Sequence, residues 1–171
     1  MDITDALRGA LREAAPRVSR YLTDPDPDVV AAAGEFVTLI GLNASGLREV
    51  MTQQIKGEQT APRLDPSALA MLLAGLIATY QDSSAPAELE PLLPGLLSHE
   101  DRDVRAVAAV AVLRHFPEWP VEDEMLDDLA WGVAEIRFPP GMCLRSVDEA
   151  MWLVEEQGLE DELMARFEEY E

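Results

Sequence analysis

Apolar residues recur along most of the chain at spacings of three and four, the period that gathers them on one face of an α-helix. The segment 66–80 is apolar almost throughout, which is typical of a helix at the centre of a packed stack. No segment of useful length alternates apolar and polar residues as a half-buried strand does. The pattern therefore predicts an all-α protein of eight or nine helices. The first helix is expected to begin near Asp2 or Thr4. The other helices are expected to cover about 27–42, 44–56, 66–80, 89–97, 102–115, 122–135, 147–158 and 159–170.

Four of these helices begin at sequences that can cap a helix. Asp26–Pro27 and Asp65–Pro66 each pair an N-capping carboxylate with proline at the first helical position. Asp101 stands in the same place before the helix at 102–115, and Ser146 with Glu149 has the spacing of a capping box. The starts near 27, 66, 102 and 147 are about 36 to 45 residues apart, so each interval encloses two helices.

Two segments of the chain are similar to one another. "LTDPDPDVVAAAGEFVTLI" (22–40) and "LSHEDRDVRAVAAVAVL" (97–113) align on their leucines. The shared pairs are Asp26/Asp101, Asp28/Asp103, Val29/Val104, Ala31/Ala106, Ala33/Ala108 and Val37/Val112. A helical hairpin cannot bury its apolar face alone, so repeated hairpins stack upon one another. We therefore expect one domain over 1–171, a right-handed α-solenoid of about four helical hairpins.

The repeated segment resembles the HEAT repeat, in which an Asp-containing turn is followed by Asp-x-x-Val-Arg and then by alanines and leucines. The copy at 97–113 fits best through Asp101, Val104, Arg105 and Ala108. The first copy has Val30 in place of the arginine, and the middle copy has lost both the valine and the arginine. Over about residues 10–117 the resemblance implies an incomplete Asp/Arg ladder between turns and a structural role for the turn residues. These residues are Asp26, Asp28, Asp65, Asp101, Asp103 and Arg105.

The formal net charge is −20, and it is concentrated in the last third of the chain. From Glu118 onward there are 17 acidic residues and three arginines, a net charge of −14. A binder of nucleic acid needs clustered Lys and Arg, so nucleic acid is not an expected partner. Two interpretations remain open: the charge only keeps the chain soluble, or it attracts a basic protein.

Candidate catalytic residues are few. A HEAT-repeat metal hydroxylase holds iron through several His-Glu pairs, whereas this chain has the single pair His99–Glu100 in an expected exposed turn. Cys143 has no motif around it and is expected to be a buried or half-buried inert thiol. No glycine-rich phosphate loop is present. We therefore predict no catalytic site, no metal site and no cofactor.

The sequence also bears on location. No run of about 18 uncharged apolar residues is present, and "MDITDALRGALREA" lacks the features of a signal peptide. With one cysteine, no disulfide can form within the chain. We expect a cytoplasmic protein that binds no membrane. Twelve of the 13 basic residues are arginine, which with the many alanines and prolines suggests a bacterial source.

The divergent acidic region 118–171 is expected to cap the solenoid and is the favoured place for a partner. Its tryptophans and the irregular segment "RFPPGM" either pack in the core or form a binding surface. The candidate partner-binding residues are Glu122, Asp123, Asp127, Asp128, Trp131, Phe138 and Met142. The expected function is non-enzymatic protein binding, for example by an immunity protein that neutralises a basic toxin. An adaptor, an assembly factor or an acidic mimic of nucleic acid are the alternatives, and a HEAT-like enzyme or lyase is less favoured.

Overall fold

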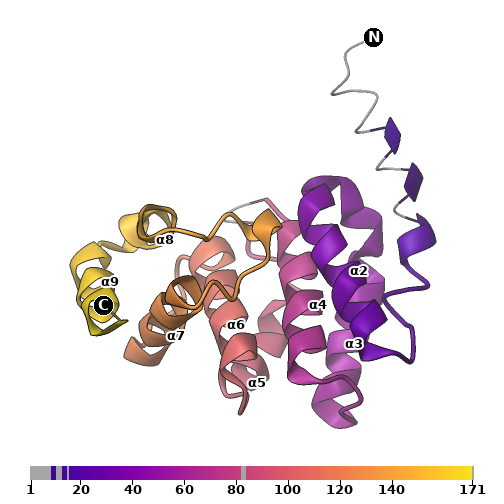
Figure 1. Ribbon diagram of the computed structural model, residues 1–171, viewed down its shortest axis with the longest axis horizontal. Helices are drawn as coiled ribbons and strands as arrows, with labels where there is room; N and C mark the ends of the chain where they lie inside the picture. The colour runs from indigo at the N-terminus through magenta and orange to yellow at the C-terminus, as the bar shows by residue number, and fades with distance from the viewer. Residues whose placement is uncertain (1–8, 11–12, 15, 82–83, 171) are drawn as a thin grey trace. The chain divides into compact units, whose positions relative to one another are not determined.

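A computed structural model describes residues 9–170, apart from 11, 12, 15, 82 and 83 (Figure 1). Its regular elements are all helices, and no strand occurs among the described residues, which confirms the all-α prediction. The first expected helix, from Asp2 or Thr4, begins outside the described residues. The α-helices are α2 (Pro27–Ile40), α3 (Arg48–Thr60), α4 (Pro66–Ala78), α5 (Leu93–Leu97), α6 (Arg102–His115), α7 (Asp123–Ala134), α8 (Val147–Val154) and α9 (Glu160–Phe167).

Several expected helices are divided by tighter 3₁₀ turns. Gly41 has a φ of +58°, which ends α2 and is followed by η1 (Gly41–Leu47) where an α-helix was expected. Short 3₁₀ turns also precede α5 and follow α8 and α9, and one lies within "RFPPGM". These turns are η2 (Glu90–Leu92), η4 (Glu155–Gln157), η5 (Glu168–Tyr170) and η3 (Pro140–Met142). The periodicity therefore located the helices, while the breaks within them depend on single residues.

The chain divides into two compact units, Met1–Gln81 and Asp82–Glu171. In the first unit, α2 packs closely on α4 where two glycines meet. A Cβ atom added to Gly34 would lie 2.5 Å from the carbonyl oxygen of Met71, and one added to Gly75 would lie 2.8 Å from that of Gly34. Val37 packs into the same contact, and Ala33 is buried beside it. Small residues thus let the backbones of α2 and α4 approach more closely than larger side chains would allow.

The helical run 27–60 is long and apolar enough to cross a membrane by length and composition alone. In the structure the run is interrupted by Gly41 and by η1, where Ala44 leaves helical geometry. The apolar side chains Val30, Val37 and Ile40 are buried in the unit that α2 forms with α4. Packing within the protein therefore accounts for part of the apolar character of α2, while Leu39 on the same helix is 61% exposed.

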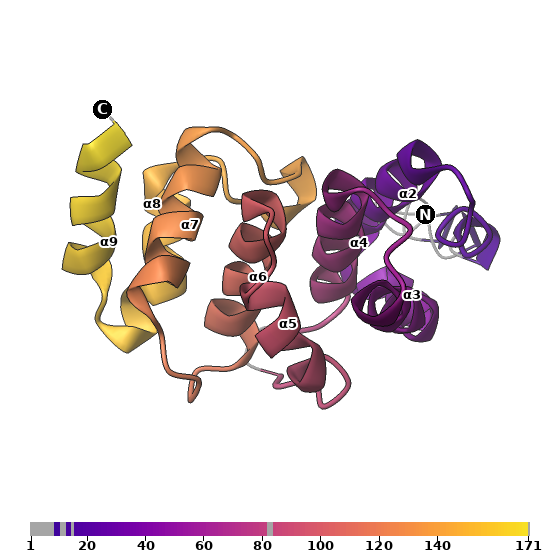
Figure 2. The same ribbon diagram turned by 90° about the horizontal axis from the view of Figure 1, so that it is seen from below.

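The second unit is built around α6. Most of its side chains from Val104 to Leu113 are buried, because α5 packs on one side of it and α7 on the other. Figures 1 and 2 show α7 between α6 and α9, with α8 alongside. Gly132 on α7 leaves room for the ring of Phe138, which would lie 2.6 Å from a Cβ atom at that position. The loop after α7 thereby folds back onto the helix that precedes it.

Candidate functional site

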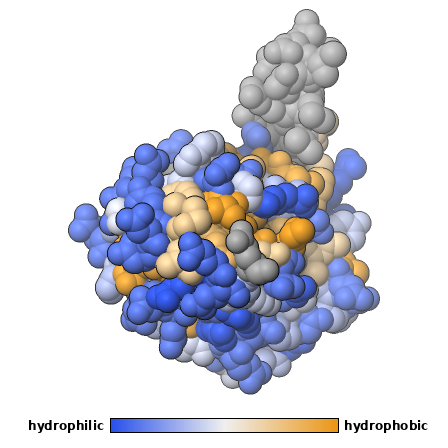
Figure 3. Space-filling model, turned by 60° about the vertical axis from the view of Figure 1, so that its left-hand side comes forward, coloured by the Kyte–Doolittle hydropathy of each residue, from blue (hydrophilic) through white to orange (hydrophobic). Residues whose placement is uncertain are grey.

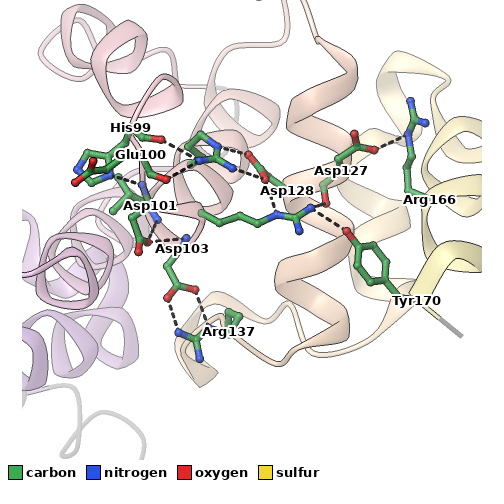
Figure 4. A network of polar contacts seen from close by, with 12 residues as sticks. His99, Glu100, Asp101, Asp103, Asp127, Asp128, Arg137, Arg166 and Tyr170 are labelled. Carbon is green, nitrogen blue, oxygen red and sulfur yellow. Dashed lines mark hydrogen bonds and ion pairs between the residues drawn. The ribbon is translucent and has the colours of Figure 1, made fainter.

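The second unit carries a network of arginines and carboxylates that joins α6, α7 and the C-terminal helices (Figure 4). We call it the α6–α7 network. Its members are Arg102, Asp103, Arg105, Asp127, Asp128, Arg137, Arg166 and Tyr170. All eight residues lie within 102–170, so the network belongs to one compact unit.

Asp128 is the centre of the network. Its side chain is only 7% exposed, and it accepts hydrogen bonds from Nε of Arg102 to Oδ1 and from Nε of Arg105 to Oδ2, both at 2.8 Å. A buried carboxylate is stable only when it is paired and hydrogen-bonded. The two arginines, one turn apart at the start of α6, supply that pairing and attach α6 to α7.

Arg102 makes further contacts with α7 and with η5 near the end of the chain. It donates from Nη2 to the hydroxyl of Tyr170 at 2.8 Å and to the carbonyl of Asp127 at 3.2 Å. Its guanidinium also lies 4.9 Å from the ring centre of Trp131, within cation–π range. Burial lowers the pKa of Arg102, but its hydrogen bonds to Asp128 and Tyr170 raise the pKa more, so that the net shift is upward. Arg102 is therefore held as a cation between α7 and η5.

Two other arginines neutralise carboxylates at the edges of the network. Arg137 donates to both oxygens of Asp103, and this pairing raises the pKa of Arg137 above its usual value. Arg166 on α9 lies 2.9 Å from Asp127 and 3.1 Å from Asp123. These pairs connect the start of α6 to the loop after α7, and α7 to α9.

The turn before α6 is held by local hydrogen bonds. Asp101 accepts hydrogen bonds from the backbone N–H groups of Asp103 and Val104, as an N-cap does. His99 is half-buried and its Nδ1 accepts the N–H of Asp101 at 3.1 Å. Arg105 donates from Nη1 to the carbonyls of His99 and Glu100. His99 is thus a half-buried part of the turn structure, where the sequence predicted an exposed turn.

The N-caps of α2 and α4 act in the same way. Asp26 accepts the backbone N–H of Asp28 at 3.0 Å, and Asp65 accepts that of Ala68 at 2.7 Å. Asp28 itself is an exposed acidic residue in the first turn of α2, where it faces the positive end of the helix dipole. These residues have structural contacts within their own turns.

A polar groove lies between the turn before α6 and the start of α7. It consists of two adjoining hollows of about 350 and 550 Å³ that share Leu97, Ser98, Arg105, Glu124 and Asp128. Trp119 and Met125 line one hollow, so the groove combines apolar walls with carboxylates. Because Asp128 already pairs with Arg102 and Arg105, the exposed Glu122 and Glu124 determine the charge that an incoming group meets. A cationic side chain with an apolar stem suits these surroundings.

The structure separates the candidate partner-binding residues into exposed and buried ones. Glu122 and Asp123 are exposed and Asp127 is half-buried beside Arg166. Asp128 lies inside the network, and Trp131 is half-buried between the guanidinium groups of Arg102 and Arg137. The remaining two, Phe138 and Met142, do not suit a binding surface, because they are 2% and 1% exposed and pack in the core. An irregular loop can supply core side chains, and its sequence alone does not distinguish that role from a surface role.

Three residues differ from the sequence-based expectation or were missed by it. Cys143 is exposed, where a buried or half-buried thiol was expected, and its backbone has a φ of +54°. Glu58 is buried and accepts the backbone N–H groups of Arg63 and Leu64, which fixes the turn after α3. Trp152 is 74% exposed; the sequence left its tryptophans open between core packing and a binding surface, and Trp152 was not among the residues chosen as candidates. The acidic residues on both sides of Trp152 in the sequence could have indicated that this side chain is exposed.

Within the described part of the chain, no group of three or more His, Cys, Asp or Glu side chains is arranged to hold a metal ion. Comparison of the chain with models of protein families, with curated proteins and with solved structures gives no match. The functional argument therefore depends on the geometry and the charge of this chain alone.

Proposed function

We propose that the protein is a non-enzymatic binding module for a basic protein, which it contacts through its second unit. The observation that carries the proposal is the internal pairing of the arginines in the α6–α7 network. Arg102, Arg105, Arg137 and Arg166 all bind carboxylates of their own unit. These four guanidinium groups are therefore engaged within the unit, while Glu122 and Glu124 at the start of α7 are exposed to solvent.

The charge balance of the second unit supports this proposal. Residues 82–171 contain 23 acidic residues and six arginines. Glu122 and Glu124 are exposed and line the polar groove together with the apolar side chains of Trp119 and Met125. Glu118 is exposed next to Trp119 in the sequence. A surface of one charge increases the association rate of a partner of opposite charge, and apolar contacts then slow its dissociation.

The binding experiment compares two sets of charge reversals on the whole protein. Basic proteins that bind the tagged chain in its host are identified, and the association rate of a purified one is measured at low and high salt. We expect Glu118→Lys, Glu122→Lys and Glu124→Lys together to lower the rate about tenfold at low salt, because exposed charges steer association. Glu13→Lys, Glu35→Lys and Glu49→Lys are the control, since they change the net charge equally in the first unit.

Three outcomes are distinguishable. A rate that falls only for the first set, with a shallower dependence on salt, supports a binding surface in the second unit. Equal effects of both sets would mean that only net charge matters. A partner that is acidic or neutral, and whose association does not depend on salt, would contradict the proposal.

We further propose that the helices stack as a HEAT-like right-handed α-solenoid. Support comes from the repeated Asp-capped helices α2, α4 and α6, whose starts are 39 and 36 residues apart. The test is NMR relaxation of backbone amides in the two compact units. A stacked solenoid tumbles as one body, so both units should have the same rotational correlation time. Clearly different correlation times would contradict stacking.

A further inference from the structure

Trp152 is an exposed aromatic side chain whose position is not explained by packing. It is 74% exposed on α8, whereas the other two tryptophans are half-buried and contact neighbouring side chains. Trp119 packs edge-on against Phe116, and Trp131 lies against two guanidinium groups. Tryptophan is among the largest apolar side chains, and it is enriched where proteins contact one another. Trp152 therefore has the properties of a contact residue for another molecule.

The surroundings of Trp152 are acidic. Residues three and four positions apart are neighbours on a helix surface, which places Asp148, Glu155 and Glu156 beside Trp152. All three are exposed, whereas Glu149 accepts the N–H groups of Arg145 and Ser146 in the capping box. Hydrophilic side chains make up most of the face shown in Figure 3, which brings forward the side of the molecule with α8 and α9.

We propose that Trp152 is the apolar anchor for a basic amphipathic segment of the protein partner, which lies along α8. The proposal rests on the proposed function and names a contact for it. The partner's apolar residues would cover the indole, while its Lys or Arg residues would pair with Asp148, Glu155 and Glu156. Charge complementarity selects this occupant.

Two other occupants are disfavoured by charge. A second copy of this chain would bring the same acidic face with it, and its net charge is also −20. An anionic membrane surface would repel the carboxylates around the indole. A basic protein segment removes both difficulties, because its cations neutralise the carboxylates that flank Trp152.

The test uses the whole protein and a synthetic helical peptide of lysines and leucines, with leucines on one face. A second peptide with serine in place of every leucine has the same charge and no apolar face. Binding is followed by tryptophan fluorescence and by calorimetry. We expect the leucine peptide to bind with a blue shift of the emission. The serine peptide should bind at least tenfold more weakly.

The decisive variant is Trp152→Ala, which should fold normally because the side chain is mostly exposed. This substitution should weaken the binding of the leucine peptide at least tenfold and abolish the blue shift, since tryptophans at the centre of an interface contribute strongly to affinity. Trp152→Phe should restore most of the affinity. Leu39→Ala is the matched control, because Leu39 is also an exposed apolar residue, 61% accessible, but lies on α2 in the first unit.

Each result bears on one proposal or on both. Unchanged affinity in Trp152→Ala, with binding that still weakens as salt rises, would overturn the anchor while leaving the proposed function in place. If neither peptide binds the native protein at low salt, both proposals are overturned. Anionic vesicles that bind the native protein through Trp152 would show that lipid, and not a basic protein, is the occupant.

Discussion

Arg105 donates its Nε hydrogen to Oδ2 of Asp128 at 2.8 Å, and this bond attaches α6 to α7 in the interior of the second unit. The carboxylate of Asp128 also accepts from Arg102, so one buried acid pairs with two arginines. The same arginine holds the turn before α6 through the carbonyls of His99 and Glu100. Asp128 is therefore structural, and the exposed glutamates around it remain the candidates for binding.

Asp128→Ala should lower the free energy of unfolding by about 1–3 kcal/mol, because both arginines lose a hydrogen-bonded partner. The two guanidinium groups are partly exposed and can form hydrogen bonds with water instead, which limits the loss of stability. Asp123→Ala is the control: its side chain is 85% exposed and pairs with Arg166 at the surface, so about 0.5 kcal/mol or less is expected. Urea denaturation of both variants measures the difference, and equal stabilities would contradict the central role of Asp128.

The contact between α2 and α4 leads to a prediction for Gly34. Gly34→Ala should destabilise the protein by about 1–3 kcal/mol, because its methyl group would meet the backbone of Met71 and force the helices apart. Gly57→Ala is the control, since no atom lies within 4 Å of a Cβ atom added there and Gly57 is inside α3. It should stabilise by about 0.5–1 kcal/mol through helix propensity. Thermal unfolding should separate the two in opposite directions.

Two alanines in similar helical positions should respond differently to enlargement. Ala108→Leu should destabilise by about 1–3 kcal/mol, because Ala108 is fully buried in α6 and the core has no room for three more carbons. Ala32→Leu should be tolerated within about 0.5 kcal/mol, since Ala32 is exposed on α2 and lines an open apolar groove of about 470 Å³. If Ala108→Leu unfolds at the same denaturant concentration as the native protein, then α6 is less closely packed than described.

His99 gives a modest prediction of its own. His99→Ala should lower stability by about 0.5–1.5 kcal/mol, because the N–H of Asp101 loses the ring nitrogen that accepts it. Glu100→Ala is the matched control, as the adjacent exposed side chain. Amide hydrogen exchange in 99–104 provides a local measure. Identical protection in His99→Ala and in the native protein would show that the ring does not hold the turn.

The sequence by itself determined where the helices begin, because a cap is a local interaction. Asp26, Asp65 and Asp101 each bind backbone N–H groups two or three residues ahead, and the expected starts at 27, 66 and 102 are those observed. The three-to-four periodicity likewise predicted an all-α protein, because it needs only one face of each helix to be apolar. Caps and apolar periodicity depend only on residues that are close together in the sequence.

Only the tertiary structure decided which side chains are buried and which charges are paired. Asp128 and Asp123 are both acids on α7, yet one faces α6 and the other faces water. Phe138 fills the space that Gly132 leaves, while Trp152 has no such partner. These differences depend on contacts between residues far apart in the sequence. Each helix has several faces, and only its packing against other helices decides which of them is buried. For that reason composition identified an acidic region, while the fold showed which of its residues are exposed.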